Sequence, residues 1–138
     1  MGPHERLNPE SLSPPVGFSH AVRVPHGTLV FLAGQTALSS AGVIVGAGLV
    51  EQFRRALENL LTALGEAGGR PSDLTKLTVF VRDMRAYRAD AREIGAVWRS
   101  LVGRDYPAMA VVGITELWDE EALVEVEGIA VVPSEPAS

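Results

Sequence analysis

Residues 50–81 read VEQFRRALENLLTALGEAGGRPSDLTKLTVFV and combine two periodicities, one helical and one extended. From Val50 to Ala67, apolar residues recur at helical spacing while charged residues occupy the opposite face. Gly68-Gly69 and Pro71 then end the helix, because neither residue type continues it well. From Leu74 to Val81 the side chains alternate between two faces, which is typical of a strand. A helix of about 19 residues followed by a strand predicts helices packed on a sheet.

The N-terminal part of the chain adds further β-prone segments. Residues 18–24 and 28–33 are separated by Pro25-His26-Gly27, which is typical of a hairpin turn. We therefore expect two antiparallel strands there. Residues 43–45 are a candidate for a short edge strand, and residues 1 to 15, which hold four prolines, are expected to be loose.

The C-terminal part predicts a second helix from Tyr87 to Val102 and strands at 107–114 and 122–132. Asp83 is the only good capping residue near the start of that helix. The order of elements predicts an α+β fold: a mixed β-sheet of about six strands with two helices on one face. Nothing in the chain is left to cover the other face, so we expect an oligomer to bury it.

Composition describes one ordinary domain. We expect a single domain over residues 1–138, with an ordered core at about 16–132. The absence of cysteine excludes a thiolate nucleophile, disulfides and cysteine-based metal sites. The three histidines, His4, His20 and His26, lack the i,i+4 spacing of zinc helices. No metal or other cofactor is expected.

Charge and hydropathy limit the kinds of partner that the protein is expected to bind. The start of the chain is polar, and the longest weakly polar run, residues 41–50, is about half of the roughly 20 residues that span a bilayer. We expect a cytoplasmic protein with no membrane partner. The formal net charge is −5 and no basic stripe is present, so no nucleic-acid partner is expected either.

Short segments spread over most of the chain then match one known pattern in order and spacing. They are Asn8-Pro9, Gly17-Phe-Ser-His-Ala21, Phe31-Leu-Ala-Gly-Gln35, Gln52, Asn59, Thr78-Val-Phe-Val-Arg-Asp-Met84, Tyr106-Pro-Ala108 and Val124-Glu-Val-Glu-Gly-Ile-Ala130. With these segments the chain resembles the RidA/YjgF/UK114 family, also called the L-PSP endoribonuclease family. The resemblance implies a chorismate-mutase-like fold and a homotrimer assembled through the open face of the sheet.

The resemblance also implies chemistry. Family members with demonstrated activity hydrolyse enamines and imines such as 2-aminoacrylate in clefts between subunits. The carried-over catalytic residue is Glu125, which would act on water near the imine carbon. The carried-over substrate-binding positions are Phe18, Ala33, Gly34, Gln35, Met109 and Val111.

Several of these positions depart from the family pattern. The arginine that holds the substrate carboxylate in the family is Met109 here, and a thioether cannot replace that charge. Phe18 stands for a tyrosine, Ala33 for a hydroxyl residue and Val111 for a polar one. We therefore expect a more apolar cleft, an uncharged or weakly polar small-molecule substrate, and weak or absent activity on 2-aminoacrylate. The alternatives are a non-catalytic ligand-binding or protein-interaction trimer and, disfavoured by the acidic charge, an endoribonuclease.

Most of these residues also have an ordinary structural interpretation. Glu125 and Glu127 share a strand face about 6.6 Å apart, as two solvated edge carboxylates also would. Met109 could be core filling, and His20 a polar strand residue rather than an acid or base. Trp118 lies in a loop, where it could border the cleft or contact another subunit.

Overall fold

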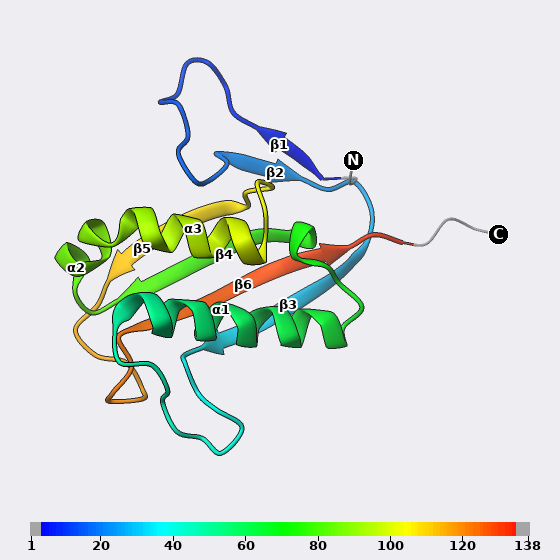
Figure 1. Cartoon of the computed structure of the whole chain (residues 1–138). Coiled ribbons are helices and arrows are strands. Elements are labelled where there is room, and N and C mark those ends of the chain that lie inside the picture. Colours follow the sequence, from blue (N-terminus) through cyan, green and yellow to red (C-terminus); the bar gives the residue numbers. More distant parts are fainter. Residues whose placement is uncertain (1–3, 135–138) are drawn as a thin grey trace.

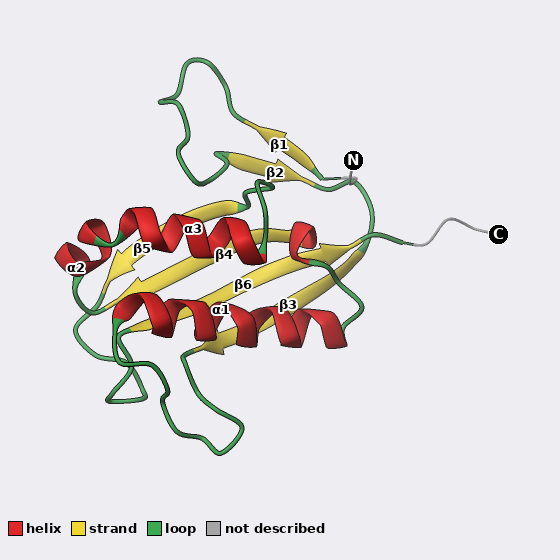
Figure 2. Cartoon of the chain, in the orientation of Figure 1, coloured by secondary structure: helices red, strands yellow, loops and turns green. Residues whose placement is uncertain are grey.

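The computed structural model describes residues 4–134, which form a four-stranded mixed sheet, a two-stranded sheet beside it, and helices on one face (Figures 1 and 2). The helices are α1 (Leu49–Glu66), α2 (Met84–Ala89), α3 (Ala91–Leu101) and a single 3-10 turn, η1 (Pro71–Asp73). The strands are β1 (Glu5–Leu7), β2 (Ala21–Arg23), β3 (Thr28–Gln35), β4 (Leu74–Val81), β5 (Ala108–Gly113) and β6 (Val124–Val132).

The four-stranded sheet has the order β3-β6-β4-β5. β6 pairs antiparallel with both β3 and β4, and β4 pairs parallel with β5. β6 is thus a central strand, consistent with its nearly continuous β-prone sequence. The predicted α+β fold with a mixed sheet is confirmed.

The helix and strand of residues 50–81 form as predicted. α1 buries Phe53, Leu57 and Leu60 completely or nearly so against the sheet. The chain leaves the helix at Gly68, which adopts a φ of +83° that L side chains rarely reach. In β4, Leu77, Val79 and Val81 face the helices, as the alternation predicts.

The single second helix predicted at Tyr87–Val102 is wrong at its start. Two helices form instead, and α2 begins at Met84, directly after Asp83. The Asp83 carboxylate accepts a 3.1 Å hydrogen bond from the Ala86 amide, so this residue is the N-cap. Asp90 ends α2 and precedes α3, because aspartate is poorly suited to a helix interior.

The hairpin predicted for residues 18–24 and 28–33 is also wrong. β2 pairs with β1, Glu5 lying opposite Arg23, whereas β3 pairs with β6. The turn at Gly27, with φ of +146°, therefore carries the chain from one sheet to the other. The nine-residue β6 offers β3 a longer ladder than the three-residue β2 could. β1 itself lies in the segment that was expected to be loose.

Six strands do form, but they belong to two sheets. The small sheet meets the large one through a bridge between Ser19 and Ala108. Ser19 donates two hydrogen bonds, from its amide to the Pro107 carbonyl at 2.9 Å and from its hydroxyl to the Tyr106 carbonyl at 2.7 Å. Residues 43–45 form no strand; Ile44 makes one isolated bridge with Leu38.

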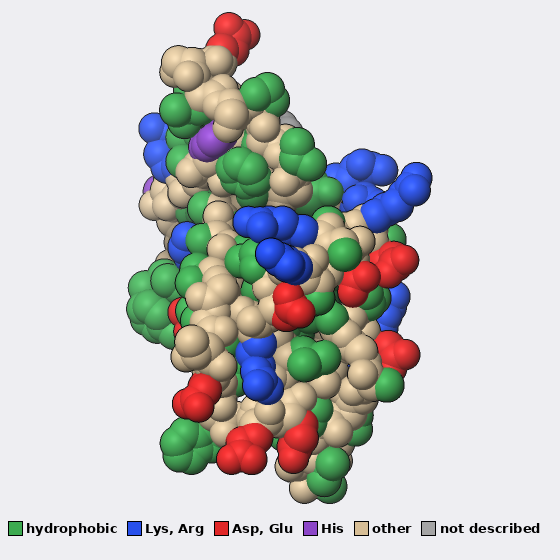
Figure 3. All heavy atoms as spheres, turned by 90° about the vertical axis from the view of Figure 1, so that its left-hand side faces the viewer, with side chains coloured by type: hydrophobic (Ala, Val, Ile, Leu, Met, Phe, Trp, Pro, Cys, Tyr) green, Lys and Arg blue, Asp and Glu red, His purple; other side chains and the backbone are tan. Residues whose placement is uncertain are grey.

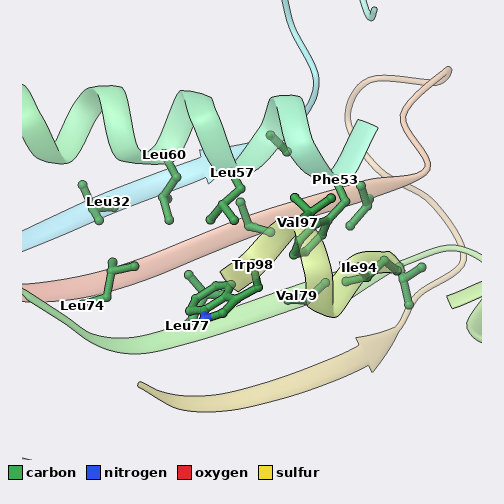
Figure 4. Close-up of a cluster of buried hydrophobic side chains, with 14 of the residues drawn as sticks. Leu32, Phe53, Leu57, Leu60, Leu74, Leu77, Val79, Ile94, Val97 and Trp98 are labelled. Carbon is green, nitrogen blue, oxygen red and sulfur yellow. The ribbon is translucent and has the colours of Figure 1, made fainter. Parts of the chain in front are cut away.

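The core lies between α1, α3 and one face of the large sheet (Figure 4). Trp98 and Val97 from α3 meet Phe53 and Leu57 from α1 above Leu77. The opposite face has no cover within the described chain: Leu29 is 55% and Phe31 73% exposed there. None of the helices within residues 4–134 is long and apolar enough to cross a membrane.

Candidate functional site

An irregularity in β3 shapes the first group of candidate residues. The β3–β6 register shifts between Leu32 and Gln35, so the β3 edge bulges at Ala33 and Gly34. Both bulge residues are exposed. A bulge of this kind turns the backbone of an edge strand outward, and such bulges are frequent beside active sites.

Glu125 lies directly against this bulge. A Cβ atom added to Gly34 would stand only 2.6 Å from Glu125 Oε1 and 2.9 Å from its Cδ. Glycine at position 34 therefore makes room for the carboxylate. We call the group formed by Ala33, Gly34, Gln35 and Glu125 the bulge site.

The surroundings of Glu125 make its carboxyl a weaker acid than an ordinary glutamate. Partial burial raises the pKa of this carboxyl above its usual value, and the charges of Asp119 and Glu127 raise it further. Asp119 is held in place by the Thr36 hydroxyl, which donates a 2.6 Å hydrogen bond to Asp119 Oδ2. A carboxyl with a raised pKa is better suited than an ordinary one to exchange protons near neutral pH.

Two amide side chains of α1 fix the loops on either side of this group. Gln52 is buried, donates to the carbonyls of Gly46 and Glu121, and accepts from the Leu123 amide at 2.8 Å. Asn59 donates to the carbonyls of Thr36 and Leu38 at 3.0 and 2.9 Å. These contacts hold the loop after β3 and the loop before β6 on the same helix, and so position the bulge site.

The remaining candidates, Phe18, Met109 and Val111, line a different place. They border a cavity of about 620 Å³ between β5, α3 and the segment before β2, which we call the α3 cavity. Trp98 and Tyr106 form one wall, with their rings stacked at a centroid distance of 6.3 Å. The volume is in the range of small-molecule sites.

Strand register explains why the two groups are separate. Met109 lies opposite Leu77 and Val111 opposite Val79, so both face the helices. Glu125 lies opposite Phe80 and faces the uncovered side. β3 and β5 are also opposite edges of the sheet, about 14 Å apart at ordinary strand spacing. One chain therefore cannot present Glu125 and Met109 to the same small ligand.

Two residues that line the α3 cavity were not predicted from the sequence. Arg92 and Arg99 of α3 line it, and they are the only charged side chains among the described lining residues. Together with Gly95 they follow the i, i+3, i+7 spacing of one helix face. That spacing was the available signal, but it lies outside the strand motif that holds Met109.

Other singled-out residues have structural surroundings. His20 Nε2 contacts the Ser13 carbonyl at 2.7 Å, and its ring meets Phe18 edge-on at 5.0 Å. Trp118 is 95% exposed and does not line the α3 cavity. Within residues 4–134, no cluster of three or more His, Asp or Glu side chains could hold a metal ion.

Similarity to known proteins extends over most of the chain. The family model described as endoribonuclease L-PSP matches residues 9–132. A RutC family protein of Pyrococcus abyssi is 32% identical over 123 residues, covering 88% of this chain and 91% of the relative. A 2-iminobutanoate/2-iminopropanoate deaminase of Dermatophagoides farinae is 28% identical, covering 96% and 99% of the two chains.

The fold is also similar to that of a solved structure. The Rid family protein YyfB of Yersinia pestis, described as of unknown function, superposes with a TM-score of 0.86 and is 32% identical, covering 95% of this chain and all of that one. The resemblance seen in the sequence is thereby confirmed. The chain belongs to the RidA/YjgF family, whose model carries the description endoribonuclease L-PSP.

Proposed function

We propose that the protein hydrolyses the C–N bond of a small imine or enamine, with Glu125 as the catalytic residue. The observation that carries this proposal is the Glu125 carboxylate lying against Gly34 at the β3 bulge, with its pKa raised by partial burial and by two neighbouring carboxylates. Such a group can take a proton from water and return it within one reaction. The cytoplasmic location expected from the sequence is part of the same proposal.

The reaction needs no redox partner. Ionised Glu125 accepts a proton from water while the water oxygen bonds to the carbon of the protonated imine, which gives a neutral carbinolamine. The protonated carboxyl then donates this proton to the nitrogen, the C–N bond breaks, and the hydroxyl proton of the carbinolamine passes to the Glu125 carboxylate as the carbonyl group forms. Ammonia leaves and takes up this proton, so the products are a carbonyl compound and ammonium, and Glu125 is ionised again.

The complete site would be built from two chains. The bulge site and the α3 cavity lie on opposite faces and near opposite edges of the sheet, so a second copy is needed to bring them together. The exposed Leu29 and Phe31 lie on the same face as Glu125 and provide apolar surface for that contact. We propose a homotrimer with a substrate cleft at each interface.

A small-molecule substrate is better supported than RNA. The formal charge of −5 repels phosphate backbones on average, whereas the α3 cavity has the size of a metabolite site. The relative from Dermatophagoides farinae is itself named a deaminase of two imino acids. A trimer that only binds a ligand or a protein is the competing proposal, and removal of the Glu125 charge separates the two.

The test is Glu125→Gln, which keeps the shape of the side chain and removes the base. Imines are generated in situ by an amino-acid oxidase from a panel of apolar amino acids, and the release of ammonia is followed. We expect turnover to fall by about 10²-fold or more, while ligand affinity changes only a few-fold.

The matched control is Glu127→Gln, on the same face of β6. It removes the same charge without touching Gly34 and should leave turnover at neutral pH nearly unchanged. Equal losses from both variants would contradict the assignment of Glu125 alone. Full turnover by Glu125→Gln with only an altered melting temperature would reject its catalytic role.

A further inference from the structure

We propose that Arg99, assisted by Arg92, anchors the carboxylate of a substrate whose apolar body fills the α3 cavity. Both arginines lie on α3, whereas the family motif places its arginine on β5, where this chain has Met109. The anion-binding group has thus moved from the strand to the helix facing it. This inference rests on the proposed function only for taking the α3 cavity as part of the substrate site.

The first support is the position of the Arg99 guanidinium. A Cβ atom added to Gly95 would lie 3.2 Å from Arg99 Nη1, so the guanidinium is folded back over Gly95. Gly95 is itself part of the cavity wall. The absence of a side chain at position 95 therefore lets the exposed guanidinium of Arg99 lie against the cavity wall.

The second support is that both arginines have unused charge. Among residues 4–134, neither Arg92 nor Arg99 has a carboxylate within 4.0 Å, whereas Arg23 is paired with Glu5 at 2.7 Å. No Asp or Glu is among the described lining residues of the cavity. Figure 3 shows one face of the molecule, on which basic side chains gather at the height of α2 and α3 and acidic ones lie mostly below. The charge is therefore available for an anion from outside the chain.

The third support is the rest of the wall, which suits an apolar group. Phe18, Met109 and the stacked pair of Trp98 and Tyr106 enclose space next to the guanidinium. Burial raises the pKa of the Tyr87 hydroxyl, so this further lining group stays neutral. A monocarboxylate with a phenyl or branched aliphatic body matches both parts of the cavity. Its apolar body would pack against the aromatic wall, and its carboxylate would bind the guanidinium. This replaces the uncharged substrate that Met109 alone predicts.

The test is a binding titration that needs no turnover. The chain has two tryptophans, so Trp118→Phe leaves Trp98, in the cavity wall, as the single fluorescent reporter. 3-Phenylpropanoate, its neutral analogue 3-phenylpropanamide, and acetate are titrated in turn. We expect the carboxylate to bind at least 10-fold more tightly than the amide, and acetate to bind weakly.

Variants of α3 assign the charge. Arg99→Gln should weaken 3-phenylpropanoate about 10-fold or more and leave 3-phenylpropanamide unchanged, and adding Arg92→Gln should weaken the carboxylate further. The matched control is Arg88→Gln on α2, which removes an exposed arginine that does not line the cavity. Thermal melting confirms that the variants are folded, which is expected because both arginines are exposed.

Any of three results would overturn the inference. They are equal affinity for 3-phenylpropanoate and 3-phenylpropanamide, an equal loss of carboxylate affinity in Arg88→Gln and Arg99→Gln, and an affinity for acetate equal to that for 3-phenylpropanoate. The binding titrations involve no turnover, so carboxylate binding without turnover of any imine would reject the proposed function and leave this inference standing. Turnover without carboxylate preference would do the reverse.

Discussion

The bulge site and the α3 cavity lie on opposite faces of the four-stranded sheet, and different interactions shape them. The bulge site is polar and acidic, and hydrogen bonds from Thr36, Gln52 and Asn59 hold the loops around it. The α3 cavity is largely apolar, shaped by packed side chains, and its only charged lining residues are arginines. Their charges are opposite in sign. A protonated imino acid carries a positive charge on its nitrogen and a negative charge on its carboxylate. Under the proposed function, the bulge site would face the nitrogen and the α3 cavity would face the carboxylate.

Separating the two half-sites should have the largest effect. We expect the wild type to sediment at about three times its 14.7 kDa chain mass. Phe31→Glu puts a charge on the exposed apolar face of β3 and should yield monomers. These monomers should have no measurable turnover, because the bulge site and the α3 cavity of one chain lie on opposite faces of the sheet. Analytical ultracentrifugation and ammonia release check both points.

The control for assembly is Val43→Ser, which removes an apolar side chain of similar exposure from a loop. It should leave mass and turnover unchanged. A wild-type monomer, or a Phe31→Glu monomer with full turnover, would contradict the two-chain site.

A smaller effect is expected from closing the space beneath Glu125. In Gly34→Ala the new methyl group would meet the flexible end of the Glu125 side chain, which can move away. We expect a loss of turnover of about 10- to 100-fold from the misplaced carboxylate, with little change in melting temperature. Kinetics and thermal melting on the same sample measure the two effects.

Gly65→Ala in α1 is the matched control, because nothing lies within 4 Å of its added Cβ. It should keep full turnover and raise the melting temperature slightly, since alanine favours helix over glycine. If Gly34→Ala lowers stability and turnover together, the glycine serves the fold and not the position of Glu125.

Restoring the strand arginine should have a smaller effect on turnover than the two changes above. Without the strand arginine, the carboxylate of 2-aminoacrylate would depend on Arg99, and this small substrate has no apolar body to fill the α3 cavity. Its binding should be weaker by about 10- to 150-fold than with the strand arginine, so wild-type deamination should be weak or absent. Met109→Arg should raise it by less than about 10-fold, because Phe18, Ala33 and Val111 still lack the polar groups of the family. Pyruvate formation coupled to lactate dehydrogenase measures this.

Ser100→Arg adds the same charge to an exposed position of α3 that does not line the cavity, and should have no effect. Wild-type activity as high as that of Met109→Arg would mean that the loss of the strand arginine is fully compensated elsewhere.

The parts of the fold that sequence predicts are those whose signals are local. The stripe of α1 and the alternation of β4 each follow from neighbouring residues, so both elements form nearly where expected. The pairing of β3 is not local. Its partner, β6, lies at the far end of the chain, so the proline and glycine turn after β2 misleadingly indicated a hairpin.

The candidate site also has features that the sequence predicts and features that depend on distant parts of the chain. The family resemblance supplies Glu125 and Gly34 as positions, but their contact depends on a bulge and on strand order, which no local pattern encodes. No arginine lies next to Met109 in the sequence. Arg99 reaches the same cavity from α3 because β5 turns Met109 toward the helices. Alternation along β5 predicts which residues share a face, but not which face the helices cover.

The smallest expected effect concerns pH and again distinguishes the two half-sites. Because the pKa of Glu125 is raised, turnover should fall with decreasing pH starting above the ordinary carboxyl range, as the base becomes protonated. Glu127→Gln removes one of the charges that raise this pKa, so its acid limb should move to lower pH while turnover at neutral pH stays the same. Binding of 3-phenylpropanamide in the α3 cavity should not change over the same pH window, because the amide group of this probe does not titrate. A pH profile of kcat and a titration of the amide at matched pH values compare the half-sites directly. An acid limb that Glu127→Gln leaves in place, or shifts to higher pH, would show that a group other than Glu125 controls it.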